Sequence, residues 1–159
     1  GALAEGFAGG AEIEVHDPSL LRLLGIDDAR YAGLVDIERV ELRRRVDRYR
    51  GARVLPNVRD RDVIVVDDGL ATGVTAEAAV RSLRGAGPHR LVLAVPVGAP
   101  DSIERLGRIA DDVVAVLAPG DFDAVGRWYV DFGQTTQPEV TDLLGTLGPH
   151  GGDGGAGVT

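Results

Sequence analysis

The strongest structural signal in the chain is DVIVVDDGLATGVT, residues 62–75. It opens with an apolar run from Val63 to Val66, which predicts a β-strand buried on both faces. Asp67 and Asp68 end this strand. A loop of small residues then leads into a helix N-terminus near Thr75. The segment therefore predicts a strand, a tight loop and a helix in succession.

The alternation of strand and helix continues downstream. Apolar spacing predicts, in order, a helix from about Thr75 to Arg84, a strand from Leu91 to Val97, a helix from Pro100 to about Ile109 and a strand from Val113 to Leu117. Strands that alternate with helices pair in parallel through right-handed crossovers. An α/β fold with a doubly wound parallel sheet is therefore expected.

A helical arm is predicted upstream of this core. Residues 11–15 alternate like an edge strand, a helical turn follows at 19–24, and Asp27 caps a longer helix that ends near Arg50. A short C-terminal helix is expected from Pro138 to Leu147. We divide the chain into a loose N-terminus (1–10), a helical region (11–53), an α/β core (54–147) and a disordered Gly-rich tail (148–159).

The composition excludes several function classes. The 159 residues contain no Cys, and all 17 basic residues are Arg, so a thiol nucleophile and a Walker A lysine are both absent. The missing Lys also excludes a response-regulator receiver and weakens the case for a haloacid-dehalogenase phosphatase. A net charge of −8 argues against nucleic acid or a membrane surface as partner. The sequence shows no membrane span and no signal peptide, so a cytoplasmic location is expected.

The loop between the predicted strand and helix is suited to bind a phosphate. Ligands of open α/β sheets bind at the carboxyl ends of the strands. Backbone N–H groups of residues 71–75 and the helix dipole favour an anion there, and Gly73 lets the backbone approach it closely. Asp67 and Asp68 would repel a phosphate, so they require vicinal ribose hydroxyls, a magnesium ion or both. A 5-phosphoribosyl ligand satisfies both requirements.

Residues 62–75 resemble the signature of type I phosphoribosyltransferases, in which an apolar strand, two acids and a Thr-Gly-x-Thr loop hold phosphoribosyl pyrophosphate (PRPP). Segments 43–53, 93–97 and 124–132 look like a bacterial branch of predicted phosphoribosyltransferases, whose helical arm forms a hood over the site. The resemblance implies a phosphoribosyltransferase-like fold. It also implies transfer of phosphoribose to a nitrogenous base or amine, with release of pyrophosphate and with Mg2+ as cofactor.

The resemblance also assigns residues to the site. The implied metal ligands are Asp67 and Asp68, and a homodimer is a candidate assembly. No catalytic residue is assigned. The implied substrate-binding residues are Asp67, Asp68, Gly69, Ala71, Thr72, Gly73, Val74 and Thr75.

Two features depart from the family pattern. Purine-salvage members carry an acid at the position of Ala71, where it is a candidate base, whereas the adenine and uracil enzymes have Ala. The family also has an earlier strand that ends in a basic-Gly-Gly loop for pyrophosphate, which we do not find here. We therefore expect a chain that begins after that loop and exposes an edge or a face of its sheet. A non-catalytic module that binds PRPP or a nucleotide, and an incomplete fragment, stay open as alternatives.

Four other features have both a structural and a functional interpretation. The Arg-rich run 39–53 is expected to be a solvated helix face, with a hood over the pyrophosphate as the alternative. Trp128 and Tyr129 are expected to pack rather than to stack on a base. Residues 97–100 form either an ordinary β–α turn or a contact for the acceptor base. The histidines at 16, 89 and 150 are too scattered to suggest a metal site.

Overall fold

The structure, a computed structural model, describes residues 2–4, 12–16, 18–50, 55–133 and 135–146. At its centre lies a sheet of three parallel strands in the order β3 (Asp62–Val66), β4 (Arg90–Val97) and β5 (Asp112–Leu117). Successive strands are connected by helices α3 (Val74–Arg84) and α4 (Pro100–Leu106). The predicted α/β alternation is confirmed.

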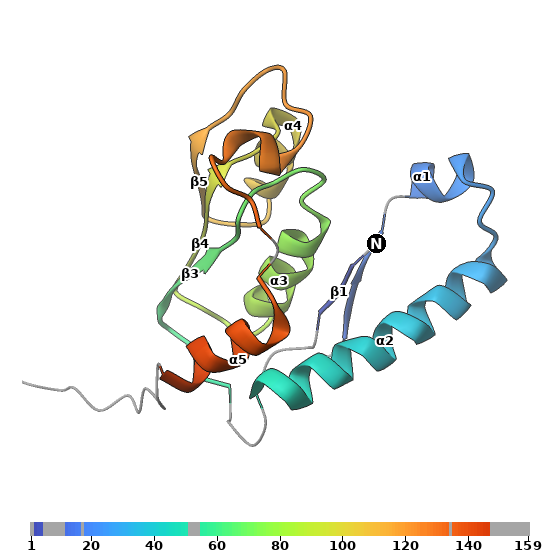
Figure 1. Ribbon diagram of the computed structural model, residues 1–159, viewed down its shortest axis with the longest axis horizontal. Helices are drawn as coiled ribbons and strands as arrows, with labels where there is room; N and C mark the ends of the chain where they lie inside the picture. Colours follow the sequence, from blue (N-terminus) through green and yellow to red (C-terminus); the bar gives the residue numbers. More distant parts are fainter. Residues whose placement is uncertain (1, 5–11, 17, 51–54, 134, 147–159) are drawn as a thin grey trace, which may run out of the picture.

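The hydrophobic core lies between one face of this sheet and the two connecting helices (Figure 1). Alternate residues of β4 point into it, so Leu91 and Leu93 are fully buried. Helix α3 contributes Ala76 and Val80, which lie one turn apart on the same helix face. Leu70, which belongs to the loop after β3, is also fully buried in this cluster. The loop is therefore part of the core as well as part of the surface.

The opposite face of the sheet is open to solvent. Ile64 and Val66 of β3 are 66% and 74% exposed, and Val116 of β5 is 78% exposed. These side chains point away from the core because successive side chains of a strand alternate between its faces. The prediction that the strand at 63–66 is buried on both faces of the sheet is therefore wrong, since the described residues leave one face uncovered. The expectation of an exposed face is confirmed, and this face is apolar.

The N-terminal part forms an arm beside the core (Figure 1). Strand β1 (Ala2–Ala4) pairs antiparallel with β2 (Ile13–Val15), and both strands pack against α3. Helix α1 (Pro18–Leu23) and the long α2 (Asp28–Arg50) follow, and α5 (Gln137–Thr146) contacts α2. The prediction of a loose N-terminus is wrong for residues 2–4, because strand pairing orders them. The remainder of that segment, 5–10, lies outside the described residues.

Most predicted boundaries agree with the structure to within a residue. The Asp27 carboxylate accepts the Arg30 N–H at 2.8 Å, which confirms Asp27 as the cap of α2. Helix α4 ends at Leu106, three residues before the predicted end, and Gly107 is its C-cap residue. A short 3-10 helix, η2 (Val125–Trp128), was not predicted. The tail 148–159 lies outside the described residues, and none of the described helices is long and apolar enough to cross a membrane.

Candidate functional site

The loop between β3 and α3, residues 67–73, is fixed to β4 at its midpoint. The Leu70 N–H donates to the Val97 carbonyl oxygen at 3.0 Å, and the Ala99 N–H donates to the Leu70 carbonyl oxygen at 2.8 Å. Leu70 and Gly98 thereby form a parallel bridge beyond the end of the β3–β4 ladder. The β–α turn at 97–100 therefore has a structural role as the anchor of this loop, while its contact with an acceptor base stays a prediction.

Helix α4 holds the second half of the loop. The Ser102 hydroxyl donates to the Ala71 carbonyl oxygen at 2.6 Å. The Arg105 guanidinium donates to the Thr72 carbonyl oxygen and forms an ion pair with Glu77 of α3. Two consecutive carbonyl groups of the loop are thus directed toward α4.

Two glycines of the loop are required by their surroundings. Gly73, which precedes α3, has a φ of 65°, and a Cβ there would lie 3.0 Å from Leu106 Cδ1. A Cβ at Gly69 would lie 2.7 Å from Val125 Cγ1 and 3.0 Å from the Val97 carbonyl oxygen. The loop can adopt this close packing only without side chains at these two positions.

The loop and the start of α3 surround a cavity of about 220 Å³. All eight residues predicted to bind substrate line this cavity. Ala76 of α3 and Val125 of η2 line it as well. The structure therefore brings together Asp67, Asp68, Gly69, Ala71, Thr72, Gly73, Val74 and Thr75.

The two acids lie on the strand side of the cavity in different environments. Asp67 is half-buried and Asp68 is exposed. Burial raises the pKa of Asp67, an effect opposed by a hydrogen bond from the Asp68 N–H and reinforced by the Asp68 charge. The Tyr129 hydroxyl donates to the Asp68 carbonyl oxygen at 2.6 Å and fixes its backbone. The pair can accept hydrogen bonds from ligand hydroxyls.

The helix side of the cavity offers hydrogen-bond donors. The first bond of α3 runs from the Glu77 N–H to the Gly73 carbonyl oxygen at 2.9 Å. The N–H groups of Val74, Thr75 and Ala76 precede that bond, so they have no partner within the helix. These groups and the helix dipole favour an anion. Among the described residues that line the cavity, none is basic.

The acid pair also fits a magnesium ion whose other ligands come from water and from the substrate. No cluster of three or more metal-ligating side chains occurs among the described residues. Two carboxylates suit Mg2+ when water and substrate oxygens complete its shell, which is the usual arrangement for this ion. Asp67 and Asp68 would then hold the metal only together with a ligand.

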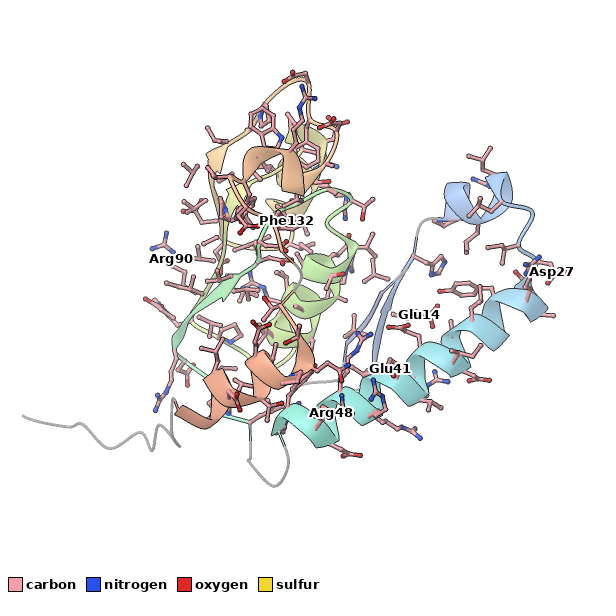
Figure 2. The ribbon with its side chains drawn as sticks, in the orientation of Figure 1. Glu14, Asp27, Glu41, Arg48, Arg90 and Phe132 are labelled. Carbon is pink, nitrogen blue, oxygen red and sulfur yellow. The ribbon has the colours of Figure 1, made fainter. Side chains whose placement is uncertain are left out.

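The Arg-rich helix lies apart from the cavity. Arg39 pairs with Glu12 at 2.9 Å, and Arg44 pairs with Glu41 at 2.8 Å. Figure 2 shows Glu41 on α2, beside strands β1 and β2. The interpretation as a solvated face with acidic partners is confirmed for these residues, and the hood over the pyrophosphate stays a prediction. Residues 51–54 lie outside the described part of the chain.

The remaining predictions concern Trp128 and the histidines, which lie outside the cavity lining or outside the described residues. Trp128 does not line the cavity, and its indole N–H is buried without a partner among the described residues, as a packing role allows. His89 pairs with Asp62 at 2.7 Å, whereas His16 packs against Tyr31 of the arm. His150 lies outside the described residues.

Four residues of the site region were not predicted in the roles they have here. Val125 lines the cavity, Tyr129 binds the acid segment, and Ser102 and Arg105 hold the loop. For Ser102 and Arg105, the only signal in the sequence was their spacing of three residues within a helix that follows a strand.

The comparisons with known proteins agree with this arrangement. Residues 22–124 match the family model described as "Phosphoribosyl transferase domain". A Mycobacterium tuberculosis (strain H37Rv) protein, whose name provisionally assigns it as a phosphoribosyl transferase, is 37% identical over 89% of this chain and 32% of its own length. The uracil phosphoribosyltransferase of Clostridium beijerinckii is 43% identical over 41% of this chain and 31% of its own length.

A solved structure is also similar. The crystal structure of the protein TT1426 from Thermus thermophilus matches with a TM-score of 0.65 and 43% identity, over 80% of this chain and 60% of that one. The chain spans about a third of the length of the curated relatives described above. The family model covers more than half of this chain. The chain therefore belongs to the phosphoribosyl transferase domain family.

Proposed function

We propose that this chain binds the 5-phosphoribosyl group of PRPP and takes part in its transfer to a nitrogenous base or amine. One observation carries the proposal: a single cavity has carboxylate acceptors on its strand side and backbone donors on its helix side. A phosphate offers acceptors and a ribose diol offers donors, so a 5-phosphoribosyl group complements both sides. Membership of the family supports the same class of ligand.

The proposed reaction forms one bond and breaks another at C1 of the ribose. A ring or amine nitrogen attacks this carbon, and the bond to the pyrophosphate oxygen breaks, so that pyrophosphate leaves with the bonding electrons. The nitrogen then loses its proton to water. Positive charge develops on the sugar, and Asp67 and Asp68, which hold the adjacent hydroxyls, stabilise it electrostatically. The residues at 71–75 contribute by positioning the 5′-phosphate. Mg2+ bound with the substrate would neutralise charge on the leaving pyrophosphate.

Calorimetry with PRPP, ribose 5-phosphate and AMP in the presence of Mg2+ tests the proposal. The wild-type chain is expected to bind at least ribose 5-phosphate saturably. The double variant Asp67→Ala/Asp68→Ala is expected to lose affinity by about 10- to 100-fold, because each carboxylate contributes charge-assisted hydrogen bonds. Asp142→Ala, on exposed α5, is the matched control and should bind as the wild type does. Absence of heat with every ligand would reject the proposal.

A second candidate function is a module that binds PRPP or a nucleotide without turnover. It is favoured by two observations: no basic side chain lines the cavity among the described residues, and Ala71 offers no base there. Pyrophosphate release, followed with PRPP against a panel of bases and amines, distinguishes the two functions. Saturable binding of ribose 5-phosphate without any pyrophosphate release supports the module, and release with one acceptor supports the transferase.

A further inference from the structure

We propose that Ser102 and Arg105 of α4 are positioning residues that set the direction of the phosphate-binding N–H groups. The inference rests on the proposed function, because it concerns the same loop. Neither residue lines the cavity. Both act on ligand binding through the carbonyl groups of Ala71 and Thr72.

Each contact fixes the orientation of one peptide plane. In a trans peptide, the carbonyl group and the following N–H point in opposite directions, and the described chain contains no cis peptide. Because the Ala71 and Thr72 carbonyls are directed toward α4, the N–H groups of Thr72 and Gly73 point away from it. The cavity lies on that other side of the loop, since the loop lines it and the two α4 residues do not.

The Ser102 contact is difficult to replace. Its side chain is buried, and its hydroxyl donates to the Ala71 carbonyl oxygen at 2.6 Å. If the peptide turned its carbonyl into the cavity, this hydroxyl would lose that acceptor in a place with little access to water. The hydroxyl therefore favours the conformation in which the amides face the ligand.

Arg105 is itself held in place by a buried acid. Glu77, in the first turn of α3, is only 8% exposed and forms ion pairs with Arg105 and, at 2.8 Å, with Arg81. An unpaired carboxylate there would be costly to bury and would repel a phosphate at the helix N-terminus. Arg105 and Arg81 together neutralise Glu77, and Arg105 also ties the helix to the loop through the Thr72 carbonyl.

The geometry of α4 brings these groups to the loop together. Ser102 and Arg105 are three residues apart and lie on one face of the helix. Leu106, beside them, occupies the space next to Gly73, where a Cβ would lie 3.0 Å from its Cδ1 atom. Because Gly73 has no side chain, α4 can lie close enough to the loop for Ser102 and Arg105 to make their contacts.

Calorimetry with ribose 5-phosphate and Mg2+ tests the inference on the full chain. Ser102→Ala and Arg105→Gln are each expected to weaken binding by about tenfold. Arg105→Lys retains the charge and one donor, so it should recover part of the affinity. Arg108→Gln is the matched control, because Arg108 pairs with Glu104 at 2.6 Å on the surface, and it should leave the affinity unchanged. Measurement well below each melting temperature keeps all variants folded.

A spectroscopic measurement separates positioning from stability. In amide NMR spectra, the Thr72 and Gly73 signals are expected to move when ribose 5-phosphate binds to the wild type, and to move less in Ser102→Ala and Arg105→Gln. A purely structural role would lower the melting temperature but leave affinity and these shifts unchanged, which would overturn the inference alone. Absence of binding to the wild type would instead overturn the proposed function, and the inference with it.

Discussion

The Tyr129 hydroxyl donates a hydrogen bond to the main-chain carbonyl oxygen of Asp68 at 2.6 Å, across 61 residues of chain. The ring of Tyr129 also packs against Phe132, with ring centroids 5.0 Å apart. The segment that follows η2 therefore supports the acid pair from a distant part of the sequence.

Tyr129→Phe tests this support. The substitution removes the hydroxyl and keeps the ring packing, so the free energy of unfolding is expected to fall by about 1 kcal/mol. Affinity for ribose 5-phosphate should fall as well, because the Asp68 backbone is less well held. Urea denaturation and calorimetry measure the two effects. Tyr31→Phe, which removes a hydroxyl bonded to Glu14 on the arm, should leave the affinity unchanged.

Gly73→Ala is expected to destabilise the fold by about 1–2 kcal/mol, because a left-handed φ is costly for any residue with a Cβ. The new methyl group would also press on Leu106. Gly120→Ala is the matched control, since a Cβ there meets nothing within 4 Å. Its free energy of unfolding should be unchanged or slightly higher. Equal stability of the two variants would contradict the required conformation at Gly73.

Asp67→Asn is expected to stabilise the fold at pH 7 while it weakens ligand binding. Burial raises the pKa of Asp67 above its ordinary value of 3.8, so the folded state holds this proton to higher pH than the unfolded state does. Stability of the wild type therefore falls as the pH rises from the unfolded to the folded pKa. Asp67→Asn should therefore have the higher free energy of unfolding at pH values above the folded pKa of Asp67, and the difference from the wild type should vanish below pH 3.8. Chemical denaturation at several pH values measures the difference, and a less stable variant at pH 7 would contradict the prediction.

Asp111→Asn is expected to have the opposite effect. A hydrogen bond from Arg84 and one from the Leu91 N–H lower the pKa of Asp111 below 3.8. The carboxylate therefore contributes stability that is present above pH 3.8 and is lost as the pH falls through the folded pKa. At pH 7 the variant should unfold more readily than the wild type, and the difference should disappear in acid. A difference that does not decrease as the pH falls below 3.8 would show that charge is not the cause.

The exposed sheet face can be tested with the double variant Ile64→Thr/Val116→Thr. Both side chains are largely exposed, so the free energy of unfolding should change by no more than about 0.5 kcal/mol per site. Binding of a hydrophobic dye and self-association in sedimentation should both decrease, because large apolar patches promote association. Leu93→Ala, in the buried core, is the contrasting control and should cost about 2–5 kcal/mol. Unchanged dye binding would show that this face is not accessible.

Local patterns predicted most of the core and the cavity lining. Residues 67–75 are contiguous, and their chemistry follows from the end of one strand and the start of one helix, so adjacent residues were sufficient to identify them. Val125 and Tyr129 reach the same cavity region from a segment without a regular period. Nothing in the local spacing indicates that this segment returns to the acid pair.

Two of the errors in the fold have the same physical origin. Ala2–Ala4 has weak intrinsic strand preference, and it is ordered by pairing with β2, which is a tertiary contact. The apolar run at 63–66 shows that a strand is hydrophobic, but not how many of its faces are covered. Whether a strand pairs, and how many of its faces are covered, depends on segments that are distant in the sequence. The hydrophobic periodicity of the strand itself does not report on those segments.

The bridge between Leu70 and Gly98 divides the loop into two short halves, 67–69 and 71–73. With both ends and the middle fixed, each half has few conformations available before a ligand arrives. The site is therefore largely preorganised, and little binding energy is lost in ordering it. The division also makes the halves independent, so Asp67 and Asp68 can keep their conformation when the side chain at position 71 is changed.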